Sequence, residues 1–138
     1  KRIFLQNKQK NKKILKDPQK IYQEMKYLFY GKKQEHFYCL YFNNKQELIE
    51  RKLLFMGTIN RSIVHPREVF KEAYLSSASS IVCVHNHPSN DIRPSKEDIY
   101  LTKRLVEIGK INGIPIADHI IVTDDAYYSF YENEIIDL

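Results

Sequence analysis

The sequence has no tryptophan, four glycines and two cysteines among its 138 residues. Cys39 and Cys83 are too few, and too far apart, for a disulfide scaffold or a cysteine-only zinc finger. No apolar run approaches the roughly 18 residues of a membrane-spanning helix. The start of the chain also lacks the apolar stretch of a secretory signal peptide. We therefore expect a cytoplasmic protein that makes no membrane contact.

Excess positive charge is confined to the beginning of the chain. Residues 1–20 hold eight of the 22 Lys and Arg but only one of the 17 Asp and Glu, whereas residues 21–138 hold 14 basic and 16 acidic side chains. Because blocks of like charge are usually solvated, we interpret residues 1–16 as a Lys-rich lead-in or linker. Such a block also attracts phosphate, so a weak contact with DNA through residues 1–16 stays open. The chain starts without an initiator Met, and we expect it to be a piece of a longer protein.

The remaining residues, 17–138, are predicted to form one α/β domain. The length fits a single domain, and 43% hydrophobic residues, including ten Tyr and seven Phe, suffice for a buried core. Capping residues and prolines predict helices that begin at Asp17-Pro18, Pro66 and Ser95. Alternating or continuous apolar runs predict strands at 35–42, 47–56, 80–84, 116–123 and 126–131, with a short additional strand at 63–64. Helices and strands that alternate in this way indicate a mixed β-sheet flanked by helices.

The most informative segment is residues 84–98, VHNHPSNDIRPSKED. His85 and His87 lie at the end of an apolar strand, where side chains two positions apart point the same way about 6.6 Å apart. Asp98 falls in the first turn of the helix that begins at Ser95, on its apolar face. Two histidines and one carboxylate leave the fourth position of a tetrahedral ion open, which is typical of a catalytic zinc site.

Each half of this pattern also has an ordinary structural explanation. The S-x-x-D run from Ser95 to Asp98 is a common helix start, in which the hydroxyl caps the helix and the acid faces its positive end. An H-x-H pair alone is a weak signal, because histidines are common in loops. The two halves at this spacing are much more specific together than either is alone.

The combined pattern resembles the JAMM motif of JAB/MPN metalloproteases, and the wider sequence resembles the RadC family of bacterial JAB-domain proteins. The matching segments are EHF (35–37), GTIN (57–60), HPRE (65–68), HNHPS (85–89), PS (94–95), DI (98–99), LTKRL (101–105) and DHII (118–121). The resemblance runs from about residue 20 to the C-terminus and implies a three-layer, cytidine-deaminase-like domain. The sequence departs from the family by having Asn90-Asp91 where a glycine is usual, and by lacking the helix-hairpin-helix-like region that precedes the domain in full-length members.

The resemblance also implies a role for each matching site residue. His85, His87 and Asp98 would bind one Zn²⁺, with a water as the fourth ligand. Such an ion lowers the pKa of its water toward about 7. Glu35 matches the general base, and Ser95 matches the residue that hydrogen-bonds the oxyanion of a tetrahedral intermediate.

Several residues remain as alternatives. Other glutamates that the sequence does not exclude as the base are Glu47, Glu50 and Glu68. Cys83 alternates onto the face of His85, but we interpret it as a small buried apolar residue. His119, with Asp118, is either a second layer behind the metal or an ordinary core histidine, and we favour the latter.

The leading functional hypothesis is a zinc-dependent hydrolase of an amide, either a peptide or an isopeptide bond. The second is an accessory module in DNA repair or DNA metabolism with weak or no hydrolase activity, suggested by the family's label and by residues 1–16. A metal-dependent nuclease ranks last, because no second carboxylate cluster indicates a two-metal site. The substrate and the oligomeric state stay open.

Overall fold

The computed structural model describes residues 17–57 and 64–136. These residues form five strands, three α-helices and one short 3₁₀ turn. The strands are β1 (Glu35–Phe42), β2 (Leu48–Gly57), β3 (Ser80–Asn86), β4 (Ile116–Val122) and β5 (Tyr127–Ser129). The helices are α2 (Pro18–Met25), α3 (Pro66–Leu75) and α4 (Lys96–Asn112), and the 3₁₀ turn is η2 (Lys26–Leu28). The predicted alternation of helices and strands is therefore confirmed.

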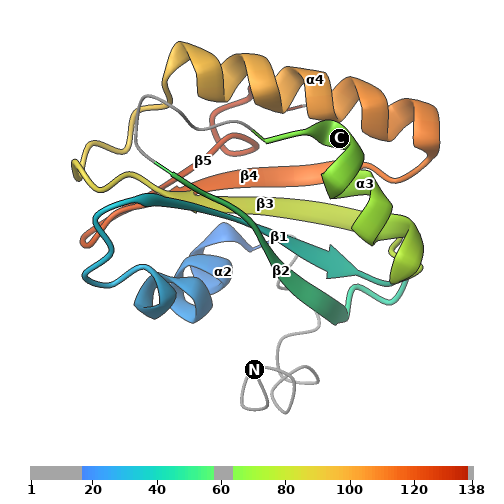
Figure 1. The fold of residues 1–138 in the computed structure, drawn as a ribbon, viewed down its shortest axis with the longest axis horizontal. Coiled ribbons are helices and arrows are strands. Elements are labelled where there is room, and N and C mark those ends of the chain that lie inside the picture. Colours follow the sequence, from blue (N-terminus) through green and yellow to red (C-terminus); the bar gives the residue numbers. More distant parts are fainter. Residues whose placement is uncertain (1–16, 58–63, 137–138) are drawn as a thin grey trace.

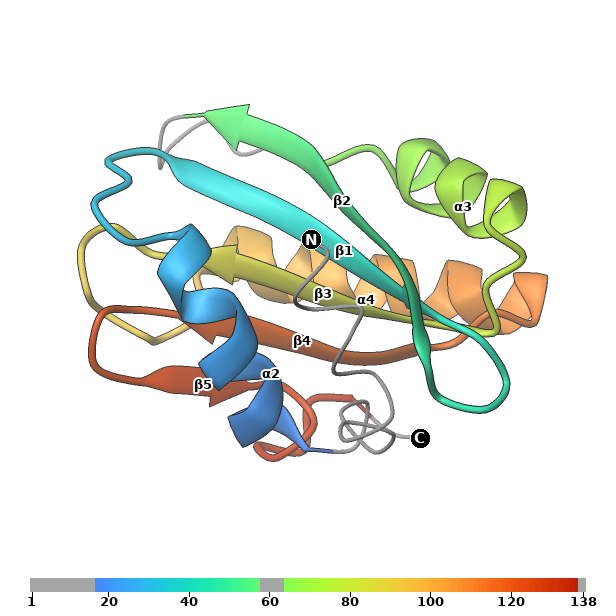
Figure 2. The same ribbon diagram turned by 90° about the horizontal axis from the view of Figure 1, so that it is seen from below.

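All five strands belong to one mixed sheet. Their order is β2-β1-β3-β4-β5, with β3 parallel to β4 and every other neighbouring pair antiparallel. Helices α3 and α4 lie on one face of this sheet and α2 lies on the other (Figure 1). Figure 2 shows the same arrangement from below, with α2 in front of the strands and α4 behind them. The predicted three-layer domain is confirmed.

The two faces of the sheet have separate apolar cores because strand side chains alternate. On β1, Cys39 and Tyr41 pack in the core beneath α3 and α4. Leu40 and Phe42 pack in the core against α2. The continuous apolar runs that the sequence shows in β1 and β3 follow from this double coverage. Cys83 lies fully buried in the first of these cores, as predicted.

The first helix begins at Pro18, as predicted, and ends at Met25, where it tightens into η2, a common way for helices to end. The predicted strand ends differ most from the structure at β3 and β5. β3 continues two residues past its predicted end, because its parallel pairing with β4 extends to Asn86. β5 is shorter than predicted, because the backbone N–H of Tyr131 turns away to donate to the Asp118 carboxylate. Of the additional strand at 63–64, residue 63 lies outside the described residues, and Val64 belongs to no strand.

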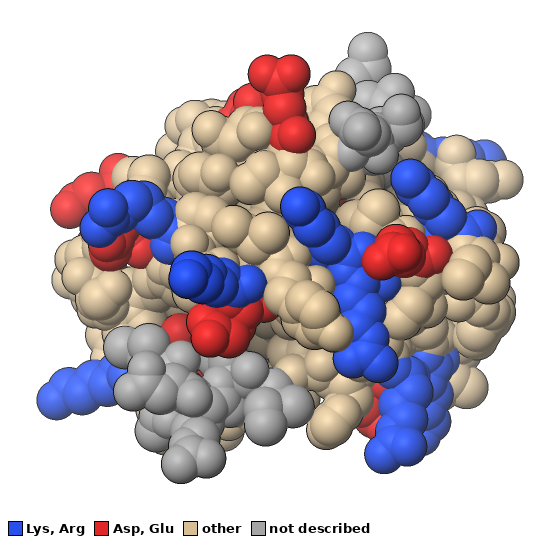
Figure 3. All heavy atoms as spheres, turned by 90° about the horizontal axis from the view of Figure 1, so that it is seen from above, with Lys and Arg blue, Asp and Glu red and all other residues tan. Residues whose placement is uncertain are grey.

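The surface over α4 carries both signs of charge. Lys and Arg side chains are interspersed with Asp and Glu on this face (Figure 3), in agreement with the near balance of charge that the sequence gives beyond residue 20. In the part of the chain that the structure describes, none of the helices is both long and apolar enough to cross a membrane. The basic lead-in, residues 1–16, lies outside the described residues.

Candidate metal centre

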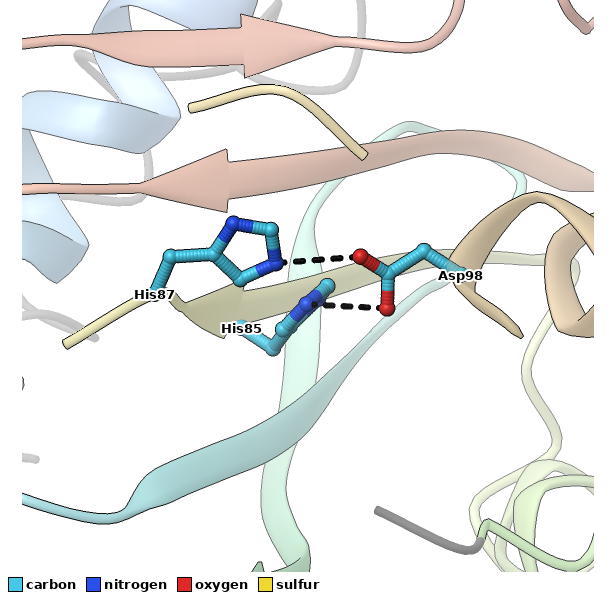
Figure 4. Close-up of side chains that lie close together, drawn as sticks. All are labelled: His85, His87 and Asp98. Carbon is cyan, nitrogen blue, oxygen red and sulfur yellow. Dashed lines mark hydrogen bonds and ion pairs between the residues drawn. The ribbon is translucent and has the colours of Figure 1, made fainter. Parts of the chain in front are cut away.

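The three predicted ligands meet where β3 ends and α4 begins. His85 and His87 turn their Nε2 atoms toward the carboxylate of Asp98 (Figure 4). The distances are 3.4 Å from His85 Nε2 to Asp98 Oδ1 and 3.0 Å from His87 Nε2 to Asp98 Oδ2. One ligand atom from each residue lies within 4.8 Å of the other two. The two histidines are two positions apart, and Asp98 lies eleven positions after His87. The fold brings the three side chains to one point.

Local structure holds each of the three side chains in place. His85 belongs to β3, and His87 follows it with its backbone N–H donating to Val122 O at 3.0 Å. At the start of α4 a complete capping box forms. The Asp98 N–H donates to Ser95 Oγ at 3.0 Å, and the Ser95 N–H donates to Asp98 Oδ2 at 2.9 Å. The structural role of the S-x-x-D pattern is therefore real, and it fixes the same carboxylate that faces the histidines.

The charges in the cluster are strongly coupled. Burial raises the pKa of Asp98, but its contacts with His85 and His87 outweigh burial and hold that pKa well below its usual range. Burial lowers the pKa of His87, but the hydrogen bonds to Asp98 and to the Asp91 carbonyl outweigh it, so that the pKa of His87 is raised. Asp98 is thus an anion near neutral pH, and it stabilises a positive charge beside it.

The donor set fits a divalent metal ion. The Asp91 carbonyl lies 2.7 Å from His87 Nδ1 and can only accept, so Nδ1 carries the proton and the Nε2 of a neutral His87 presents a lone pair to Asp98. His85 Nε2 is buried and has no hydrogen-bond partner. Two imidazole nitrogens and a carboxylate that face one another in a buried place are stabilised by a positive charge between them. Nitrogen and oxygen donors in this number suit zinc and its neighbours among the transition metals.

Glu35 reaches the same place from the start of β1. It is only 6% exposed, and its Oε1 lies 4.0 Å from His85 Nε2. The main chain on both sides of it is held by Asn86, at the end of β3. Asn86 Oδ1 accepts from the His36 N–H at 2.6 Å, and Asn86 Nδ2 donates to Gln34 O at 3.1 Å. Nothing in the sequence had distinguished Asn86 except its position between the two histidines.

The three other glutamates lie elsewhere. Glu47 accepts from Asn43 in the turn between β1 and β2. Glu50 pairs with Tyr41 near the opposite end of β1 from Glu35. Glu68 is exposed in the first turn of α3. Of the four glutamates considered, Glu35 is the one that lines the cavity over the metal cluster.

That cavity has a volume of about 880 Å³. Its polar floor contains Glu35, His85, His87 and Asp98, and Ser95 lies on its wall. The Ser95 hydroxyl oxygen accepts from the Asp98 N–H, which leaves the hydroxyl proton available to another acceptor. Two uses are expected for Ser95 from the sequence, the helix cap and a hydrogen bond to an oxyanion. The two uses need different parts of the hydroxyl.

His119 has more contact with the centre than the sequence indicated. Its Nε2 lies 2.7 Å from His85 Nδ1, and its Nδ1 lies 2.6 Å from Thr102 Oγ1. The Asp118 carboxylate does not contact the His119 ring, because it accepts from the backbone N–H groups of His119 and Tyr131 and from the Ser129 hydroxyl. The favoured interpretation of His119 as an ordinary core residue is therefore incomplete. The DHII segment was the available signal, but it did not indicate which residue His119 contacts.

Comparisons with known proteins give a family and several relatives. The family described as the RadC-like JAB domain matches residues 15–135. Similar proteins include UPF0758 protein BcerKBAB4_4299 of Bacillus mycoides (strain KBAB4), UPF0758 protein BCAH187_A4587 of Bacillus cereus (strain AH187) and a UPF0758 protein of Bacillus anthracis (strain A0248). Each is 56% identical to this chain over 110 residues, which are 80% of this chain and 47% of the relative. The chain thus spans about half the length of these curated relatives.

Proposed function

Because the chain belongs to the RadC family of JAB-domain proteins, we propose that it is a zinc-dependent hydrolase of an amide bond, in a peptide or an isopeptide. The observation that carries the proposal is the convergence of His85, His87 and Asp98 on one point in a cavity that Glu35 also lines. Two histidines and one carboxylate leave a coordination position for water or substrate.

The metal would supply a Lewis acid and lower the pKa of a bound water toward about 7. His85, His87 and Asp98 would hold it. Asp98 keeps its negative charge near neutral pH, because its pKa lies well below the usual range. The two imidazoles add no charge, so the three side chains would reduce the ion's charge by one only. A site that keeps a net positive charge polarises water and carbonyl groups.

The side chains of the cavity would move the protons. The Glu35 carboxylate would take a proton from the attacking water and pass it to the leaving nitrogen, which is the usual task of a general base that turns acid. The Ser95 hydroxyl would donate to the oxygen that becomes negative in the tetrahedral intermediate. Both groups belong to rigid elements, the start of β1 and the cap of α4.

The decisive test separates metal binding from turnover. Metal-stripped protein would be titrated with Zn²⁺ by calorimetry and then screened against peptide and isopeptide substrates. Glu35→Gln should keep Zn²⁺ affinity within a few-fold of wild type and lose about 10²–10⁴-fold in turnover, the usual contribution of a general base. Glu50→Gln, on β2 and away from the cavity, is the matched control and should keep both Zn²⁺ affinity and turnover close to wild type.

The proposal fails if wild-type protein binds no Zn²⁺, or if Glu35→Gln cleaves the substrate as fast as wild type. Tight metal binding with no cleavage of any peptide or isopeptide would instead favour the accessory module in DNA metabolism. That alternative depends on residues 1–16 and would be examined by DNA binding at increasing salt, with and without those residues.

A further inference from the structure

Two buried polar residues lie behind His85, on the side away from the cavity, and the proposed mechanism does not use them. They are His119 in β4 and Thr102 in α4, with exposed fractions of 0% and 1%. With His85 they form a chain of short contacts: Thr102 Oγ1 to His119 Nδ1 at 2.6 Å, and His119 Nε2 to His85 Nδ1 at 2.7 Å. A third contact joins Thr102 Oγ1 to the carbonyl oxygen of Asp98 at 2.8 Å.

The direction of every hydrogen bond in this series follows from the bond between Thr102 and the Asp98 carbonyl. A backbone carbonyl can only accept, so the hydroxyl of Thr102 must donate its one proton to Asp98 O. Toward His119 the same oxygen can then only accept. His119 Nδ1 must therefore carry a hydrogen and donate it to Thr102.

His119 passes this constraint on to His85. Its ring is fully buried between Phe130, stacked at 4.7 Å, and the ring of Phe37, so a charge on it would be costly. A neutral ring with its hydrogen on Nδ1 has a bare Nε2, which can only accept. His85 must therefore donate from Nδ1.

We infer that Thr102 and His119 are positioning residues, which fix His85 as the Nδ1–H tautomer and so direct its Nε2 lone pair into the metal centre. This explains why His85 Nε2 is buried without a hydrogen-bond partner: it is the bare end of a chain whose hydrogens all point away from the cavity. The inference rests on the proposed metal centre. It extends the usual rule that a ligating histidine donates its second N–H to a fixed acceptor, because here the acceptor is itself fixed by a third group.

The opposite tautomer would impair the site. With its hydrogen on Nε2, His85 would direct that hydrogen toward Asp98 Oδ1, 3.4 Å away, and would occupy the position of the ion. The hydrogen would then have to move from Nε2 to Nδ1 before His85 could act as a ligand. Removal of an outer partner of this kind typically lowers metal affinity about 10–100-fold.

Two pairs of variants test the chain link by link. Thr102→Val keeps the shape of the side chain but removes the acceptor for His119, whereas Thr102→Ser keeps the hydroxyl. His119→Leu removes the acceptor for His85, whereas the amide oxygen of His119→Gln can still accept. We expect Zn²⁺ affinity to fall about 10–100-fold in the Val and Leu variants and to stay within a few-fold of wild type in the Ser and Gln variants. Circular dichroism and thermal melts would show whether each variant is folded.

The second measurement is the tautomer itself, from the ¹⁵N chemical shifts of the His85 ring in metal-stripped protein at mildly alkaline pH. Wild type, Thr102→Ser and His119→Gln should show the hydrogen on Nδ1, and Thr102→Val should show a shift toward Nε2. A wild-type His85 with its hydrogen on Nε2 would overturn the inference. So would folded Thr102→Val and His119→Leu variants that bind Zn²⁺ as wild type does. Neither readout depends on amide cleavage, so the inference and the proposed function can fail separately.

Discussion

Asp98 and Asp118 are both buried on elements that pack against each other, yet their carboxylates have opposite properties. Asp98 faces two imidazole nitrogens, and these hold its pKa far below the usual range against the effect of burial. Asp118 faces the backbone N–H groups of His119 and Tyr131 and the hydroxyl of Ser129. Burial dominates there and raises the pKa of Asp118 to about 6.

The difference shows how to distinguish a carboxylate that could bind a cation from one that only stabilises the fold. A carboxylate held by neutral donors, like Asp118, has its oxygens satisfied and joins two pieces of backbone. A carboxylate that faces basic nitrogens in a cavity, like Asp98, has partners that are satisfied only when a proton or a metal ion lies among them. The second arrangement is the one that a cation stabilises.

The largest expected effect separates the two carboxylates by metal binding. Asp98→Asn should weaken Zn²⁺ binding by more than about a thousandfold, beyond the 10–100-fold of an outer-shell change, because it removes the single anionic ligand. Asp118→Asn should keep affinity within about tenfold, because its side chain does not face the cavity. Calorimetric titration of both variants measures this. Equal losses would mean that the two carboxylates do not differ as described.

The next effect distinguishes the two carboxylates by the pH dependence of the free energy of unfolding. The pKa of Asp118 is about 6 in the folded chain and near 3.8 in the unfolded chain, so the folded chain binds more protons between these values. Stability from Asp118 is therefore greatest at low pH and declines as pH rises through this window, by up to about 3 kcal/mol. Urea unfolding of metal-stripped wild type and Asp118→Asn, compared at each pH, isolates this contribution. A difference between the two that is constant over the window would contradict it.

The smallest expected effect concerns the pH dependence of metal binding. The pKa of His87 is raised in the metal-free chain, and binding must displace its proton. Zn²⁺ affinity should therefore fall about tenfold per pH unit below that pKa and level off above it. Titrations in buffers of different ionisation enthalpy would count the proton released. Asp118→Asn should show the same profile, and affinity independent of pH in wild type would count against a histidine ligand.

The sequence predicted that His85, His87 and Asp98 come together, because the positions of these residues are encoded locally. His85 and His87 are close in sequence on one strand end, and the capping pattern from Ser95 fixes where Asp98 stands in its helix. Strand and helix periods then determine which way these side chains point. The element boundaries were less accurate, as in β3, because a strand ends where its partner stops pairing rather than where its own sequence changes.

The choice among the glutamates was beyond local reasoning. Glu35 lies 50 positions before His85, and the two are brought near one another by the antiparallel pairing of β1 with β3, in which Phe37 stands opposite His85. A shift of the pairing by one residue would turn Glu35 to the other face of the sheet. The structure supplies that register and places Glu35 beside the centre, while its task as the general base stays a prediction.

By itself, the sequence determined a mixed α/β domain and a cluster of two histidines and one aspartate that could hold a metal ion. Helix and strand periods, caps and close spacing are properties of short segments, which is why the sequence was enough. Only the tertiary structure decided that Glu35 faces the cluster, that Asn86 holds it there, and that His119 and Thr102 lie behind His85. These contacts join β1, β3, β4 and α4, and they depend on the sheet order and on burial, which no single segment contains. The sequence pattern around a histidine in an apolar strand does not show which side chains the histidine contacts. Those contacts, which come from the tertiary structure, determine its role.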